Sequence, residues 1–141
     1  MRAHQIVDRS SRRAFALAGK ATFTLRSPST GKWFTYHVES GRPLMRPIWF
    51  VSLLFTPASY AYLGFLGEDE AWRHGGSKSC ARPDATSSRA FDWCWYRISR
   101  LRSLAGAEFW HEGSCGRCGR TLTVPGSLAA GLGPVCQGKS R

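Results

Sequence analysis

Acidic residues are scarce in this chain of 141 residues: nine Asp and Glu stand against twenty Lys and Arg, which gives a formal net charge of +11. The nine carboxylates are scattered without an obvious pair, which argues against acid–base catalysis by paired carboxylates. Sixteen of the twenty cations are arginine, whose planar guanidinium suits phosphates and base edges better than a lysine ammonium does. This imbalance favours a polyanionic partner, most often nucleic acid.

Long apolar runs are also missing. The most apolar stretch, residues 48–55, is less than half as long as a membrane-spanning helix, so we expect it to be a buried strand. Residues 1–13 lack the apolar segment of a signal peptide. With an odd number of cysteines, five, and no export signal, we expect reduced thiols in a cytoplasmic protein, where metal binding is favoured over disulfides.

Catalytic motifs are absent as well. The segment from His111 to Cys115 is not the H-E-x-x-H motif of zinc proteases, because its fifth residue is cysteine. Neither the zinc-deaminase signature, nor a P-loop, nor a G-x-S-x-G elbow occurs. We therefore predict that the protein is not an enzyme. A nuclease or other hydrolase that uses His37, His74 and an acid is the least favoured hypothesis.

The pattern that is present predicts an α+β fold. Alternating apolar and polar residues predict strands over residues 21–26, 32–39, 48–55, 60–66, 71–74 and 107–111, and the helical period predicts a helix from residues 84–88 to 101. The expected architecture is an antiparallel meander of four to five strands, packed by one main helix and closed by a C-terminal zinc-knuckle module. We expect a basic flexible arm over 1–18, the sheet and helix over 19–106, and the zinc-binding module over 107–141.

The predicted helix has two unlike faces. Its apolar face, expected to lie on the sheet, carries Phe91, Cys94, Trp95, Ile98 and Leu101. Its opposite face carries Arg89, Trp93, Tyr96, Arg97 and Arg100. Aromatic rings stack on bases and arginines pair with phosphates, so we expect this face, extended by Arg117 and Arg120, to bind the partner. The alternative is that Trp93 and Tyr96 pack against the N-terminal arm or the C-terminal module.

Three of the five cysteines lie near the C-terminus. Cys115 and Cys118 form a C-x-x-C pair, and Cys136 follows after an insert, a spacing typical of structural zinc sites. Gly119 suits the positive φ that such a turn uses. Residues 123–131 predict a short helix with a Thr123 cap, an early proline and a closing glycine. The competing interpretations are a reduced thiol pair packed in a loop and a redox C-x-x-C.

The fourth ligand is the open question of this site. His111, four residues before Cys115, is favoured by its position, and Cys80, His74 and His37 remain candidates. Cys94 is expected in the core. Four protein donors leave no position for water, so we expect one structural zinc ion per chain.

The C-terminal motif also resembles a known family. The run Cys115-Gly-Arg-Cys-Gly-Arg-Thr-Leu-Thr-Val-Pro, followed by Ser127 and Gly131-Leu-Gly-Pro-Val-Cys136, is similar to an uncharacterised Cys-rich, zinc-binding family of unknown function in bacteriophages and prophages. Its motif is H-x3-C-x2-C-G-R followed by G-x-G-P-x-C. Gly126 stands where members often carry Glu. The resemblance implies a phage setting and the ligands His111, Cys115, Cys118 and Cys136, but no established activity.

Together these features predict a zinc-stabilised, small basic phage-type protein that binds nucleic acid or a nucleoprotein complex in the host cytoplasm, without a membrane. The alternative is an anti-defence inhibitor of the anti-CRISPR kind, which acts by protein–protein binding to a host defence complex through the same arginine and aromatic residues. That alternative is motivated by the phage resemblance.

Overall fold

A computed structural model describes residues 3–42, 45–56 and 58–137. In chain order its elements are β1 (His4–Gln5), α1 (Arg9–Ala16), β2 (Lys20–Arg26), β3 (Trp33–Gly41), β4 (Ile48–Thr56), β5 (Ser59–Leu66), β6 (Trp72–His74), η2 (Gly76–Lys78), α2 (Thr86–Ser99), β7 (Glu108–His111), α3 (Pro125–Ala130) and α4 (Pro134–Gln137). We refer to residues 112–137, which follow β7, as the C-terminal module. No helix in these described ranges has both the length and the apolar character of a membrane span.

The strands form one antiparallel sheet of seven, in the order β1-β7-β2-β3-β4-β5-β6. The predicted antiparallel meander is therefore present as β2 to β6, but the strand count is higher than the four or five expected. The difference arises because β1 and β7 also join the sheet, and because β7 does not simply lead into the C-terminal module. It pairs along β2, with Phe23 opposite His111 and Leu25 opposite Phe109, so residues 108–111 belong to the sheet.

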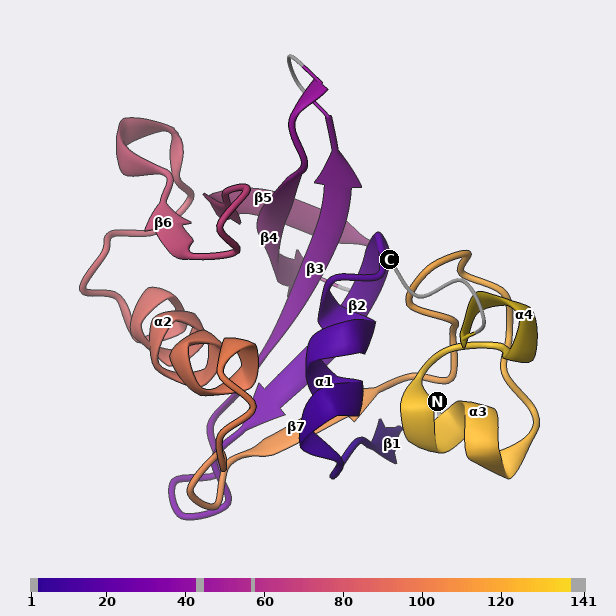
Figure 1. Ribbon diagram of the computed structural model, residues 1–141. Coiled ribbons are helices and arrows are strands. Elements are labelled where there is room, and N and C mark those ends of the chain that lie inside the picture. The colour runs from indigo at the N-terminus through magenta and orange to yellow at the C-terminus, as the bar shows by residue number, and fades with distance from the viewer. Residues whose placement is uncertain (1–2, 43–44, 57, 138–141) are drawn as a thin grey trace.

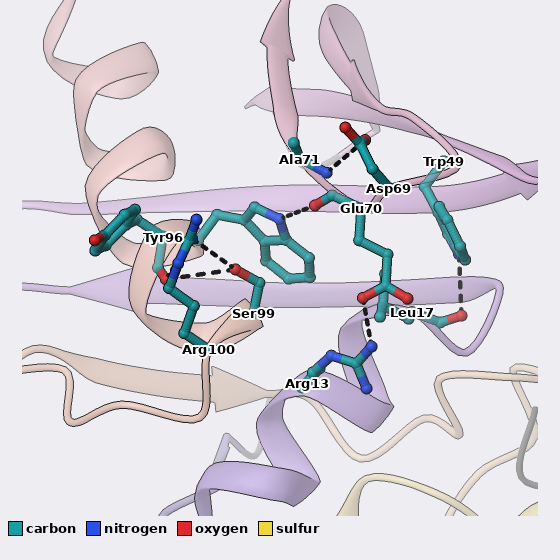
Figure 2. A network of polar contacts seen from close by, with 10 residues as sticks. Arg13, Leu17, Trp49, Asp69, Glu70, Ala71, Tyr96, Ser99 and Arg100 are labelled. Carbon is teal, nitrogen blue, oxygen red and sulfur yellow. Dashed lines mark hydrogen bonds and ion pairs between the residues drawn. The ribbon is translucent and has the colours of Figure 1, made fainter.

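The N-terminal segment differs from the expected flexible arm. Its described residues form β1, which pairs with β7, and α1, which is capped by the Asp8 side chain accepting a hydrogen bond from the Ser11 N–H. Although this segment carries many charges, one side of it is buried: Ile6, Phe15, Ala16 and Leu17 are all in the core. The indole N–H of Trp49 donates to the Leu17 carbonyl oxygen at 3.0 Å, and Arg13 pairs with Glu70 (Figure 2).

Helices α1 and α2 lie on the same side of the sheet (Figure 1). The core between the helices and the sheet is rich in aromatic rings: Phe23 stacks on Phe109, with ring centroids 4.5 Å apart, and Phe91 lies tilted against Tyr36, at 5.0 Å. No helix covers the other side of the sheet within the part of the chain that the structure describes. Trp33 and other aromatic residues on that open side stay exposed.

The apolar face of α2 is confirmed at four positions, since Phe91, Cys94, Trp95 and Ile98 are buried. The indole N–H of Trp95 donates to the Glu70 carbonyl oxygen at 2.7 Å (Figure 2). The prediction for Leu101 is wrong: this residue is 46% exposed, with φ of 56°. The helix ends at Ser99, where Leu101 N–H donates to the Ile98 carbonyl and Arg102 N–H to the Arg97 carbonyl. This is a Schellman motif, in which the left-handed residue leaves the helical surface.

Candidate functional site

Three cysteines of the C-terminal module converge on one point. The sulfur atoms of Cys115, Cys118 and Cys136 lie within 4.8 Å of one another, close enough to hold a metal ion together. None of the three forms a disulfide. Cys115 and Cys136 are buried, whereas Cys118 is exposed. We call these residues the thiol cluster.

The backbone of the C-x-x-C turn places the first two sulfurs. Gly119 N–H donates to the Cys115 carbonyl at 2.8 Å, and Gly119 has φ of 80°, as its position after the second cysteine predicts. Cys115 N–H in turn donates to the Arg120 carbonyl at 2.8 Å. These two hydrogen bonds hold the turn in a conformation that brings the sulfur atoms of Cys115 and Cys118 close together.

The insert brings the third sulfur back. Helix α3 begins with Pro125 and is closed by Gly131 in the left-handed conformation, both as predicted. The predicted Thr123 cap is wrong, because the N-cap residue is Val124 and no side chain caps the helix. A further helix, α4, was not predicted, because four residues are too few to show a helical period; it carries Cys136 to the cluster.

Backbone N–H groups favour the thiolate form of Cys115. Burial raises the pKa of this thiol, but N–H groups of Gly133, Cys118 and Arg117 lower it further, to about 7. The Gly133 and Arg117 donors each lie 3.4 Å from the Cys115 sulfur. Burial raises the pKa of Cys136, and the neighbouring thiols add to this effect. A metal ion binds a cysteine in its deprotonated form. Of the two buried cysteines, Cys115 is therefore the one that loses its proton more easily when a metal ion binds.

His111 does not join the thiol cluster. Its Nδ1 accepts a hydrogen bond from Gly113 N–H at 3.0 Å, and its Nε2 lies 2.6 Å from the Leu128 carbonyl oxygen, to which it donates. This is the neutral imidazole with its proton on Nε2, and burial lowers its pKa. Neither nitrogen has a lone pair to spare for a metal. His111 ties β7 to α3 instead of acting as the expected fourth ligand.

The same arrangement occurs at His74. Its Nδ1 accepts from Gly76 N–H at 3.0 Å, and its Nε2 lies 2.7 Å from the Ala81 carbonyl oxygen. Both histidines stand in the local sequence H-x-G, in which the ring folds back over the second following N–H. This H-x-G pattern is the sequence signal that His111 forms hydrogen bonds to two backbone segments. Its spacing to Cys115 favoured the prediction of a metal ligand instead.

The other fourth-ligand candidates also lie elsewhere. Cys80 is half buried in a loop, where its thiol approaches the Ala61 carbonyl oxygen, and His37 contacts the Thr22 hydroxyl at 2.8 Å on the open side of the sheet. Cys94 is in the core, as predicted, where burial raises its pKa to about 12. Among the described residues, no fourth His, Cys, Asp or Glu reaches the thiol cluster.

Replacement of His111 by alanine should leave the metal content of the protein unchanged. It should lower the free energy of unfolding by about 2–4 kcal/mol, because one buried carbonyl and one buried N–H lose their partner. Elemental analysis and urea denaturation measure the two effects. His74→Ala, which breaks an equivalent bridge away from the cluster, is the matched control. Loss of metal from the His111 variant alone would show that the imidazole is a ligand.

The predicted partner-binding residues of α2 form a layered surface, which we call the α2 outer face: Arg89, Trp93, Tyr96, Arg97 and Arg100. The Arg97 guanidinium carbon lies 4.0 Å from the centre of the Trp93 ring, and that of Arg100 lies 4.0 Å from the centre of the Tyr96 ring. Figure 2 shows Arg100 beside Tyr96, held by hydrogen bonds to Ser99 and to the Tyr96 carbonyl.

Both rings of this face are accessible. Trp93 is 43% and Tyr96 45% exposed, so they do not pack against the N-terminal segment or the C-terminal module. Arg102, just beyond the helix, adds a third cation at 5.7 Å from the Tyr96 ring centre. It was missed because it follows the helix end, where the Schellman turn directs the chain back. None of the ion pairs among the described residues involves these arginines.

Arg117 and Arg120 do not extend this surface. Both are exposed in the C-terminal module, which lies on the opposite side of α1 from α2 (Figure 1). Arg117 lines a hollow with residues of α1 and α4, to which α2 contributes nothing. The prediction that the two arginines join one patch is wrong because it took nearness in sequence for nearness in space.

Comparisons with the curated proteins and with the solved structures give no match. Residues 105–141, which include β7 and the thiol cluster, match a family model described as "Family of unknown function (DUF6011)". That description names no activity, ligand or source. The C-terminal part of the chain is therefore similar to a family of unknown function, which is consistent with the expected resemblance to an uncharacterised family.

Proposed function

We propose that this protein is a small basic nucleic-acid-binding protein whose C-terminal module is stabilised by one zinc ion. The observation that carries the proposal is the α2 outer face, where arginines without an acidic partner in the described structure lie over half-exposed aromatic rings. Reduced thiols fit a cytoplasmic location, and the phage setting remains part of this proposal through the motif alone.

The thiol cluster fits zinc by its donor chemistry. Cysteine thiolates are the commonest donors of structural zinc sites, and two backbone N–H groups already face the Cys115 sulfur. Zinc bound by Cys115, Cys118 and Cys136 would cross-link the C-x-x-C turn to α4. The ion serves stability here, because no carboxylate or free imidazole of the described residues joins the cluster to act as a base.

The α2 outer face supplies the two interactions that nucleic acid requires. Arginines neutralise phosphates and release counterions, while exposed aromatic rings stack on bases without regard to sequence. A guanidinium stacked on a ring is held in place before the ligand arrives, so less side-chain entropy is lost on binding. The formal charge of +11 adds a long-range attraction for a polyanion.

The double variant Arg97→Glu with Arg100→Glu should strongly weaken oligonucleotide binding without unfolding the protein. Both residues lie on the solvent side of α2, and each phosphate that the variant no longer neutralises should reduce the salt dependence of log K by about 0.9 for duplex or 0.7 for single strands. Fluorescence anisotropy of labelled oligonucleotides at several salt concentrations measures this. Arg9→Glu with Lys78→Glu, which changes the net charge equally at two other exposed sites, is the matched control.

Equal loss of binding in both double variants would mean that net charge alone drives association and that α2 is no specific surface. If the folded, metal-loaded protein binds neither single-stranded nor duplex oligonucleotides, the proposal is wrong. Tight binding to a host protein complex in that case would support the alternative of an inhibitor that acts by protein–protein contact.

A further inference from the structure

A groove of about 740 Å³ opens beside the first half of α2. It lies between that helix, the loop that joins β2 to β3, and the loop that leads into β7. Apolar, hydroxyl and cationic side chains line the groove. Among the lining residues are Arg26, Lys32, Phe34, Arg89, Ala90 and Trp93. The volume falls within the range of small-molecule sites, about 300–1,000 Å³.

The inner part of the groove is apolar. Phe34 is partly buried and packs on the core cluster, and Cys94, which also lines the groove, is itself part of that core. Trp93 forms a more exposed wall. Flat apolar walls of this kind receive a planar aromatic group and exclude water from it.

The rim of the groove is cationic. Arg26 pairs with Glu108 at 3.0 Å, so its charge is largely compensated. Lys32 and Arg89 make no ion pair with the described residues, and each lines the groove. Two uncompensated cations beside an apolar slot match a ligand that joins a flat ring to an anion.

Trp93 connects the groove to the α2 outer face. The Arg97 guanidinium lies 4.0 Å from the Trp93 ring centre, but Arg97 does not line the groove. Trp93 thus belongs both to the wall of the groove and to the α2 outer face. Tyr96 and Arg100, which also belong to the α2 outer face, follow Trp93 along the helix.

We propose that this groove receives one unstacked nucleotide of a single-stranded nucleic acid, with its base against Trp93 and Phe34 and its phosphate between Lys32 and Arg89. This inference rests on the proposed function and narrows it to single strands. A base in a duplex is paired and stacked, and it reaches a recessed apolar slot only when it is flipped out, which costs free energy.

Two variants test the groove. Ala90→Leu fills it with a good helix former and changes no charge, and Trp93→Ala removes the stacking wall. Each should weaken binding of a labelled single-stranded oligonucleotide, the second by roughly 5- to 150-fold in Kd. Trp33→Ala removes a tryptophan that is 61% exposed on the open side of the sheet and should leave Kd unchanged. DNA and RNA single strands are measured in parallel with a duplex of the same sequence.

The wild-type protein should bind at least one type of single strand about tenfold or more tightly than duplex, and the DNA and RNA arms show which. Duplex binding as tight as single-strand binding would overturn the inference. So would wild-type affinity in Ala90→Leu, or a loss confined to Trp33→Ala. If Arg97→Glu with Arg100→Glu loses binding while both groove variants keep it, the proposal of nucleic-acid binding is supported. The inference that the groove receives a nucleotide is then wrong. Circular dichroism and metal content confirm that each variant is folded.

Discussion

Cys118→Ser should release the metal ion and unfold the C-terminal module while the sheet stays folded. The Cys118 side chain is exposed, so its replacement removes a ligand and little packing. The module has a small hydrophobic core of its own, in which Cys115, Leu122 and Cys136 are buried and Leu128 and Leu132 are partly buried. In zinc-finger peptides the metal contributes about 10–16 kcal/mol of apparent binding free energy, and such modules are unfolded without it.

Hydrogen–deuterium exchange read by mass spectrometry separates the two parts of the molecule. Peptides from residues 112–137 should lose their protection, whereas peptides from β2 to β5 should keep it, because the main core does not include the thiol cluster. Metal content should fall from about one ion per chain to nearly none. A strong chelator added to the wild-type protein should have the same effect.

Cys80→Ser is the matched control, because Cys80 is a half-buried free thiol outside the cluster. It should retain the metal ion and the exchange pattern of the wild type. Full metal content in Cys118→Ser would show that Cys118 is not a ligand, and unchanged protection of residues 112–137 after chelation would show that the module folds by packing alone. The proposal of a stabilising zinc ion would then be wrong.

Most of the sheet was predictable because its strands alternate between a buried and an exposed side. Tyr36 and Val38 on β3 face Leu53 and Val51 on β4, and each pair lies on the core side. A period of two that continues over six or more residues specifies a strand and its register without knowledge of the rest. The metal cluster was predictable for a related reason, since the C-x-x-C spacing brings two sulfurs together by local turn geometry.

The errors share a different cause, which is dependence on partners distant in sequence. Strand β1 has two residues and no period, and it exists because β7 offers an edge to pair with. The many arginines of α1 favour the prediction of a flexible arm. The burial of Phe15, which contradicts that prediction, depends on contacts with segments distant in sequence. The ring orientation of His111 depends likewise on the carbonyl of Leu128.

Phe15→Ala should destabilise the whole molecule by about 3–5 kcal/mol, the usual cost of removing a fully buried phenylalanine. Phe15 is 1% exposed, and its ring centroid lies 5.9 Å from that of Phe109 and 5.3 Å from that of His111. The ring therefore joins α1 to the sheet, and it also packs on the C-terminal module, where a Cβ atom added at Gly116 would meet it. Urea denaturation of the metal-loaded protein measures the change, and Phe55→Ala, at a position that is 58% exposed, should cost less than about 1 kcal/mol.

A second substitution tests whether Phe15 is the contact that joins the module to α1. Gly131 has φ of 73°, and a Cβ atom added there would collide with the Phe15 ring. Gly131→Ala should thus destabilise the wild type through both the collision and the backbone strain, but the Phe15→Ala protein through the strain alone, about 1–2 kcal/mol. The two substitutions should therefore be strongly non-additive. Simple additivity would mean that the module does not pack on Phe15, and that the metal ion alone holds it in place.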